Sequence, residues 1–317
     1  MKKIYHLKMN DKVNNHPLIG RLISENPLFA GMDHSALKIE AFVKDTVRDA
    51  PRRFFLRDGG GRLIWVVAIS NSDFPEAVAD WAARGRRVAA LLDATMRETV
   101  VLPEAEGRID GRSFAIWPAY ETWSENKYLR LVQQAASTKR VLRWLVELAR
   151  QTRQDAGFAD DLVAPLSVLE SETELPAELR RRVADLIGNV ERRGFGPVRI
   201  AQHGDFWYGN VLQDRMPGLP GSSLRVIDWG TGRVDGYPFV DILTFISSLP
   251  RPLQKRGPAM MRFYMTSLGQ QLDDAAIYQA AALGDLGRNL AQFPRRRYLQ
   301  LVIDRFALLD RLRVGSA

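Results

Sequence analysis

Hydrophobic positions in the first third of the chain fall in short, strand-length runs that polar and glycine-rich segments separate. Residues 1–35 show no clear hydrophobic periodicity and are broken by Asn-Pro and His-Pro pairs, so we expect an N-terminal extension with one short helix at most. Strand-like runs follow at 36–43, 53–57 and 62–70. The last run is rich in β-branched and aromatic residues, which favours a strand.

A turn and a helix connect this region to two further expected strands. The glycines at 59–61 suit a hairpin turn that needs positive φ. Pro75 suits the first turn of a helix, and the helical pattern continues to about residue 94. Two more strands are expected at 99–103 and 112–117.

The rest of the chain carries mainly helical patterns. Apolar residues recur at helical spacing from 137 to 154. The acidic stretch 155–178 contains Pro165 and Pro176, where we expect breaks, and another helix is expected at 178–193. The pattern therefore predicts an α+β protein in which a small strand-rich part precedes a larger helical part.

Composition narrows the class of protein. A chain of 317 residues can bury a large core and suggests two domains or one bilobal fold. No apolar stretch follows the basic N-terminus, and the run at 63–69 is too short to span a bilayer, so we expect neither a secretion signal nor a membrane protein. The absence of cysteine excludes disulfides and thiolate metal sites, and it permits a cytosolic location.

The net charge of +8 is concentrated toward the end of the chain. Residues 286–317 carry seven arginines against two aspartates. Such a run is either the solvated face of helices or a site for an anionic partner or substrate. Elsewhere the arginines are mixed with acids, so charge alone does not predict nucleic-acid binding.

Two short segments carry the chemistry of the chain. The first reads His-Gly-Asp-Phe-Trp-Tyr-Gly-Asn at 203–210, and the second reads Val-Ile-Asp-Trp-Gly at 226–230. They contribute Asp205, Asn210 and Asp228, each beside a strand-like run. ATP-dependent phosphoryl transfer needs such a set, because one acid accepts the proton of the attacking hydroxyl while an amide and another acid hold metal ions.

These segments resemble the aminoglycoside phosphotransferase and choline kinase-like family. Its catalytic loop usually reads His-Gly-Asp-hydrophobic-x-x-x-Asn, its metal segment reads hydrophobic-Ile-Asp-Trp or similar, and a Gly-x-Pro-x-x-Asp run commonly follows, as at 236–241 here. The resemblance covers residues 203–241. It implies a bilobal protein-kinase-like fold with a small antiparallel sheet lobe and a larger, mainly helical lobe.

On this basis we expect three parts. Residues 1–35 form the N-terminal extension, 36–117 the nucleotide-binding small lobe, and 118–317 the helical lobe with the catalytic loop, the metal loop and the substrate pocket. The resemblance makes Asp205 the catalytic base and gives Asn210 and Asp228 to Mg²⁺. Taken singly, each of these side chains could instead fix a turn or cap a strand end.

Four further side chains in or beside these segments are expected to have structural roles or to contact a ligand. His203 is expected to orient the catalytic loop by hydrogen bonds. Asp241 is expected either to brace that loop or to cap a helix. Trp207 and Trp229 either stack on a substrate or belong to the core.

The sequence departs from the kinase pattern in the small lobe. Such lobes carry a lysine on the third strand, paired with a helix glutamate, but the run 62–70 has no lysine. Glu76 is the candidate for that glutamate.

The stretch 44–53 carries Lys44, Arg48, Arg52 and Arg53, and we expect one of these cations, with Lys44 or Arg52 preferred, to replace the missing charge. The Arg-Arg-Phe-Phe run at 52–55 is similar to a run in sugar kinases of this superfamily. We expect Pro118 and Tyr120 to lie in the hinge beside adenine.

The function we expect is transfer of the γ-phosphoryl group of ATP (or GTP) onto a hydroxyl of a small molecule, with Mg²⁺, in the cytoplasm where ATP is found. A sugar, an aminoglycoside or an amino alcohol is compatible. Acids between 155 and 174 would suit a cationic acceptor, whereas the basic C-terminal helices favour a neutral or phosphorylated sugar. The alternatives are a catalytically silent kinase-like protein that binds nucleotide or ligand, and nucleic-acid binding. Oligomeric state is not predicted.

Overall fold

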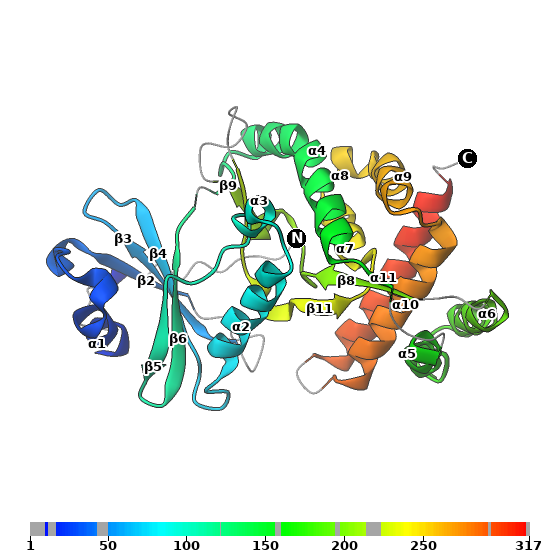
Figure 1. Cartoon of the computed structure of the whole chain (residues 1–317), viewed down its shortest axis with the longest axis horizontal. Coiled ribbons are helices and arrows are strands. Elements are labelled where there is room, and N and C mark those ends of the chain that lie inside the picture. The colour runs from blue at the N-terminus through cyan, green and yellow to red at the C-terminus, as the bar shows by residue number, and fades with distance from the viewer. Residues whose placement is uncertain are drawn as a thin grey trace.

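A computed structural model gives the structure of this protein and describes residues 10–11, 17–42, 50–120, 122–155, 160–193, 197–213, 223–290 and 293–314. Figure 1 shows a strand-rich lobe at one end and a helical lobe at the other. Within the described ranges, no helix combines the length and the apolar character that crossing a membrane requires.

The small lobe is built on one antiparallel sheet of order β1-β2-β3-β4-β6-β5. Its strands are β1 (Asn10–Asp11), β2 (Lys38–Phe42), β3 (Arg52–Arg57), β4 (Leu63–Ile69), β5 (Ala105–Ile109) and β6 (Arg112–Pro118). Gly61 has a φ of +83° in the turn between β3 and β4, which is the conformation expected of that glycine segment.

Alternation along β3 gives the sheet two different faces. Phe54 and Leu56 are buried in a cluster with Ile19 and Ile23 of α1 (Pro17–Glu25). Two 3₁₀ turns follow this helix, so the N-terminal segment contributes more structure, and more of the core, than the single short helix expected. The opposite face of β3 presents Arg53 toward the helical lobe.

The segment between β4 and β6 differs from the expected pattern. The helix α2 (Ala77–Ala90) ends earlier than predicted and is followed by the short helix α3 (Ala94–Arg97). The strand predicted at 99–103 is wrong, because Val100 makes only an isolated bridge to Val226 and the strand lies later, at β5. Residues 99–101 pack against the helical lobe, where Val100 is buried.

The helical lobe packs helices of different lengths around a second hydrophobic core. They are α4 (Lys127–Thr152), α5 (Asp160–Glu170), α6 (Ala177–Arg193), α7 (Val240–Ser248), α8 (Arg251–Gln254), α9 (Gly257–Leu268), α10 (Leu272–Arg288) and α11 (Arg295–Val314). The helix α4 begins ten residues before the predicted start, where Asn126 caps it by accepting hydrogen bonds from two backbone N–H groups.

Pro165 lies inside α5, where the sequence predicted a break. The ring removes one backbone donor, which normally weakens a helix interior. Here α10 packs against the helix at that point, and a Cβ added at Gly284 would lie 1.9 Å from the Pro165 carbonyl oxygen. Close helix–helix packing therefore outweighs the preference of proline against the interior of a helix.

The structure also contains two small sheets outside the small lobe. One pairs β9 (Val211–Gln213) with β10 (Leu224–Val226), and the other has the order β11 (Arg233–Gly236), β8 (Val198–Gln202), β7 (Gln154–Asp155). The loop that joins β8 to β9 contains Asp205, and the loop that follows β10 contains Asp228.

The bilobal α+β fold predicted from the sequence is confirmed. The boundaries at 35 and 117 stay predictions. Val88 and Ala89 of α2 are buried in the core of the helical lobe although they precede residue 118. The helix α2 thus contacts both lobes and fixes one wall of the space between them.

Candidate active site

The loop after β8 points its side chains alternately inward and outward. Phe206, Tyr208 and Asn210 are buried, whereas Asp205 and Trp207 are exposed. The phenol of Tyr208 donates to the Gln134 carbonyl at 2.6 Å, and burial raises its pKa. The inward side chains anchor the loop, so its acidic and aromatic groups are presented to solvent from a fixed backbone.

Asp241 braces this loop. Its carboxylate accepts hydrogen bonds from the backbone N–H groups of His203 (2.6 Å) and Gly204 (2.8 Å). The N-cap of α7 is Phe239, which makes no side-chain cap, so of the two expected roles for Asp241 the brace is the one observed. Complete burial raises the pKa of the Asp241 carboxyl.

His203 connects the two loops. Its Nδ1 accepts from the backbone N–H of Asp205 (3.3 Å), and its Nε2 is then the protonated nitrogen that donates to the Ile227 carbonyl (2.8 Å). The ring is fully buried. These are the orienting hydrogen bonds expected of this histidine.

Asn210 links the loop that contains Asp205 to the loop that contains Asp228. Its side-chain N–H donates to the backbone carbonyl of Asp205 at 2.8 Å, and its backbone carbonyl accepts from the backbone N–H of Ile227 at 3.0 Å. Asp228 follows directly, in a left-handed conformation with φ of 64° and ψ of 56°. A positive φ is uncommon for a non-glycine residue and clusters at functional sites.

The donor set fits Mg²⁺. Because the amide nitrogen of Asn210 is turned to a carbonyl, its Oδ1 is the atom left to face a metal, and Asp228 adds a carboxylate. Across the described ranges no group of three or more His, Asp or Glu side chains forms a metal cage. Magnesium usually takes only one or two protein ligands beside phosphates and water, so an acid and an amide suffice.

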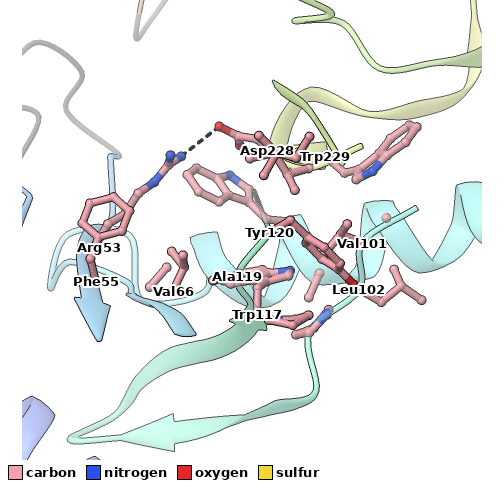
Figure 2. Close-up of a pocket in the computed structure, with 18 of the residues that line it drawn as sticks. Arg53, Phe55, Val66, Val101, Leu102, Trp117, Ala119, Tyr120, Asp228 and Trp229 are labelled. Atoms are coloured by element: carbon pink, nitrogen blue, oxygen red, sulfur yellow. Dashed lines mark hydrogen bonds and ion pairs between the residues drawn. The ribbon is translucent and has the colours of Figure 1, made fainter. Parts of the chain in front are cut away.

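An apolar cavity of about 180 Å³ lies beside these loops, between the sheet and α2 (Figure 2). Pro118 and Tyr120, predicted to lie in the hinge, both line it. Val66 and Ala68 line it from β4, and Asp228 lines its opposite wall.

The cation in this cavity is not one of the two predicted. Arg52 is exposed and does not line the cavity, because it lies on the other face of β3. Lys44 lies outside the described residues. Arg53 lines the cavity, and its guanidinium donates to Asp228 Oδ2 at 3.0 Å, as Figure 2 shows. The Arg-Arg-Phe-Phe run at 52–55 therefore lies on the strand that supplies the cation, but Arg53 and not the preferred Arg52 faces the cavity.

Glu76 does not accompany this cation. It pairs with Arg108, and both side chains are exposed. The helix α2 instead supplies Trp81, whose ring centroid lies 5.3 Å from the Arg53 guanidinium carbon. Reading the alternation of β3 together with the helical face of α2 would have found this pair.

The two tryptophans of the loops have different environments. Trp229 is buried and donates its indole N–H to the Val226 carbonyl at 3.0 Å, so it belongs to the core. Trp207 is 41% exposed. A Cβ added at Gly209 would lie 2.2 Å from its ring, so the indole rests flat on that glycine, one edge of the cavity.

The basic C-terminal helix α11 packs on α7 through Arg305. The guanidinium donates to the Leu243 carbonyl (3.0 Å) and to the Thr244 hydroxyl (2.9 Å) of α7. Burial lowers the pKa of Arg305, and the negative charges of Asp304 and Asp205 oppose that shift. The far end of α11 differs, because Arg295 pairs with Glu172 and Glu174.

Comparison with protein-family models and with curated proteins finds no match. Solved structures do match. One is a choline/ethanolamine kinase family protein from Mesorhizobium loti, at 16% identity over 95% of this chain and 94% of that one, with a TM-score of 0.52. Another is a choline kinase from Streptococcus pneumoniae, at 11% identity over 93% and 99%, with a TM-score of 0.50.

An aminoglycoside phosphotransferase from Streptomyces rimosus also matches, at 12% identity over 77% of this chain and 91% of that one, with a TM-score of 0.47. Identities this low establish the fold alone. The chain thus has the bilobal fold of the choline/ethanolamine kinase structures, the fold that its 203–241 segment predicts.

Proposed function

We propose that this protein transfers the γ-phosphoryl group of ATP or GTP to a hydroxyl group of a small molecule, with Mg²⁺ as the metal. The observation that carries this proposal is the hydrogen-bonded chain from Asp205 through Asn210 to Ile227, the residue before Asp228, beside an apolar cavity. It brings an acid, an amide and a second acid together from two separate loops.

Asp205 is the proposed base. Its side chain is exposed on a loop whose backbone is tied at His203, Gly204 and Asn210, so an acceptor can reach it while its position stays fixed. It would orient the attacking hydroxyl and take its proton as the bond from oxygen to phosphorus forms and the bond to the leaving diphosphate breaks.

Asn210 and Asp228 are the proposed metal ligands. Mg²⁺, when bound, neutralises phosphate charge during transfer. Asn210 would offer Oδ1 and Asp228 its carboxylate. The left-handed backbone at Asp228 turns this side chain toward the cavity, which it lines.

The cavity suits a purine. Its walls are mainly aliphatic and aromatic, and hinge residues Pro118 and Tyr120 close one side. Pockets of this kind use apolar walls for affinity and a few polar groups for orientation. The ring of Tyr120 is held in place by Arg225, whose guanidinium carbon lies 5.6 Å from the ring centroid.

The acceptor class that the site favours is a neutral or anionic hydroxyl compound, such as a sugar. Glu172 and Glu174, which could have formed an acidic pocket, are paired with Arg295 instead. Aminoglycosides and amino alcohols, which are cationic, are less favoured.

The competing function is a silent binding protein, and it is favoured by the ion pair that Arg53 makes with Asp228. A thermal-shift titration with ATP and with GTP, each with and without Mg²⁺, combined with nucleotide turnover over a panel of hydroxyl compounds, separates the two. Stabilisation by Mg²⁺-nucleotide together with acceptor-dependent turnover supports transfer. Nucleotide binding without turnover over the whole panel supports the silent protein.

A further inference from the structure

The β4 strand offers no cation to the nucleotide cavity. The strand lines the cavity through Leu63, Val66 and Ala68, and all three are apolar. A lysine carried by this strand would project from one of these positions. The charge that usually contacts the α- and β-phosphates must therefore come from another element.

The neighbouring strand places an arginine opposite this gap. Arg53 of β3 pairs with Ala68 in the antiparallel register. Directly opposite residues on one sheet face have their Cβ atoms within roughly 4.5–5.5 Å of each other. The long side chain of Arg53 thus starts beside the small one of Ala68 and reaches the same space.

The Arg53 guanidinium already faces the proposed metal ligand. It lies 3.0 Å from Asp228 Oδ2, with about a third of the arginine side chain still exposed (33%). Guanidinium carries five N–H donors in a planar fork that matches phosphate oxygens. The Asp228 contact uses one edge of that fork, so the same group can bridge the aspartate and a nucleotide phosphate.

Trp81 replaces the usual helix glutamate as the partner of the cation. The ring lies 5.3 Å from the guanidinium carbon, within cation–π range. It is held by Gly230 in the metal loop, where an added Cβ would come within 2.9 Å of the indole. An aromatic face suits a delocalised guanidinium better than an ammonium, so this site is built for arginine.

We propose, on the basis of the proposed function, that Arg53 binds the phosphates of the nucleotide, with Trp81 stacking beneath it and Asp228 as its partner when no nucleotide is bound. The cation that contacts the phosphates would therefore lie on β3 and not on β4. Arg53 is then a residue that contacts the co-substrate.

The test compares phosphate-dependent affinity in matched variants. Dissociation constants for ATP and for adenosine are measured by calorimetry in the absence of metal, for wild type, Arg53→Gln and Arg52→Gln. Arg52 is the control, because it carries the same charge on the same strand but faces away from the cavity. Arg53→Gln is expected to weaken ATP binding roughly ten- to a hundredfold, the size of a lost charged hydrogen bond, and adenosine binding less than about threefold. Arg52→Gln should change neither.

A second comparison makes Arg53→Gln in an Asp228→Asn background. It distinguishes direct binding of phosphate by Arg53 from an indirect effect, in which Arg53 only neutralises the charge of Asp228. A direct contact predicts that Arg53→Gln still weakens ATP relative to adenosine there, and that Arg53→Lys recovers only part of the loss. Retained adenosine binding shows in each variant that the cavity is folded.

The outcomes distinguish the two proposals. If wild type binds neither ATP nor GTP, with or without Mg²⁺, in the thermal-shift titration above, the proposed function and this assignment both fall. If wild type binds ATP but Arg53→Gln leaves the ratio of ATP to adenosine affinity unchanged, or changes it only while Asp228 is present, the Arg53 assignment is overturned and the proposed function stands. If Arg53→Gln loses adenosine binding as well, the ATP affinity of Arg53→Lys becomes the test. A wild-type ATP affinity in Arg53→Lys would show that the planar guanidinium is not required for phosphate binding.

Discussion

The side-chain amide of Asn210 donates a 2.8 Å hydrogen bond to the backbone carbonyl of Asp205. One residue of the proposed metal pair therefore also fixes the backbone of the proposed base. Asn210 itself is 5% exposed and is fixed in turn by the backbone N–H of Ile227. A change at this position should affect both metal binding and loop geometry.

We expect Asn210→Ala to lower activity and to raise the concentration of Mg²⁺ needed for half-maximal rate. Loss of the buried hydrogen bond should also cost about 1–3 kcal/mol of unfolding free energy. Magnesium titration of the rate, combined with urea unfolding, checks both effects. If Asn210 only fixes a turn, stability will fall while the magnesium dependence of the residual activity stays as in wild type.

Asp205→Asn should reduce kcat by about 10²–10⁴, the usual contribution of a positioned base. The side chain is exposed, so thermal stability and ATP affinity should stay close to wild type. Steady-state kinetics and calorimetry on the same preparation measure these quantities. Exposed Asp235 provides a matched control, since Asp235→Asn should leave kcat unchanged. A fully active Asp205→Asn protein would remove this residue from the mechanism.

Trp207 is expected to contact the acceptor. Its indole is 41% exposed, rests on Gly209 and lies two residues from the base. We predict that Trp207→Ala raises the KM for the acceptor by roughly tenfold, the range of an aromatic contact, with the KM for ATP unchanged. Trp207→Phe should retain most of the affinity. An unchanged acceptor KM in the alanine variant would show that the ring is only a cover for the loop.

Stability should depend on pH through Asp241. Burial raises its pKa in the folded state, so the folded protein binds more protons than the unfolded chain above the ordinary aspartate pKa of about 4. The contribution of Asp241 to stability is therefore full below that pH and is lost as pH rises through the folded-state pKa. Asp241→Asn lacks this titration.

Unfolding free energies of wild type and Asp241→Asn, measured from about pH 5 to about pH 8, should converge as pH rises. We expect the variant to be less stable by about 1–3 kcal/mol at the acid end, because one of the two backbone N–H groups would face the amide NH₂, a donor, where the hydroxyl oxygen of the protonated carboxyl can still accept. A difference that widens toward alkaline pH would mean that the two N–H groups outweigh burial and that the pKa is lowered.

Much of the site could be predicted because its signals are local. Asp205, Asn210 and Asp228 lie in short segments whose residue types and spacing match those that phosphoryl transfer needs. The positive φ expected in the glycine turn needed only knowledge of one residue type. Pro118 and Tyr120 followed from their position directly after a predicted strand.

What the sequence did not reveal depends on contacts between distant segments. Choosing Arg53 over Arg52 required knowing which face of β3 meets the cavity, and that is set by α1 covering the other face. The partner of Arg53 required the packing of α2 on the metal loop at Gly230. Pro165 remained in a helix because Gly284 of α10 allows close approach there.

The central claim is tested most directly by incubating the protein with Mg²⁺, ATP and a pooled set of small hydroxyl compounds, and then searching by mass spectrometry for gain of one phosphate. GTP replaces ATP in a parallel reaction. We predict that at least one compound, most readily a sugar, gains a single phosphate with wild type and not with Asp205→Asn. Phosphate gain that persists at the full rate in Asp205→Asn, or no gain in any compound although nucleotide binds, would contradict the assignment of this protein as a phosphotransferase.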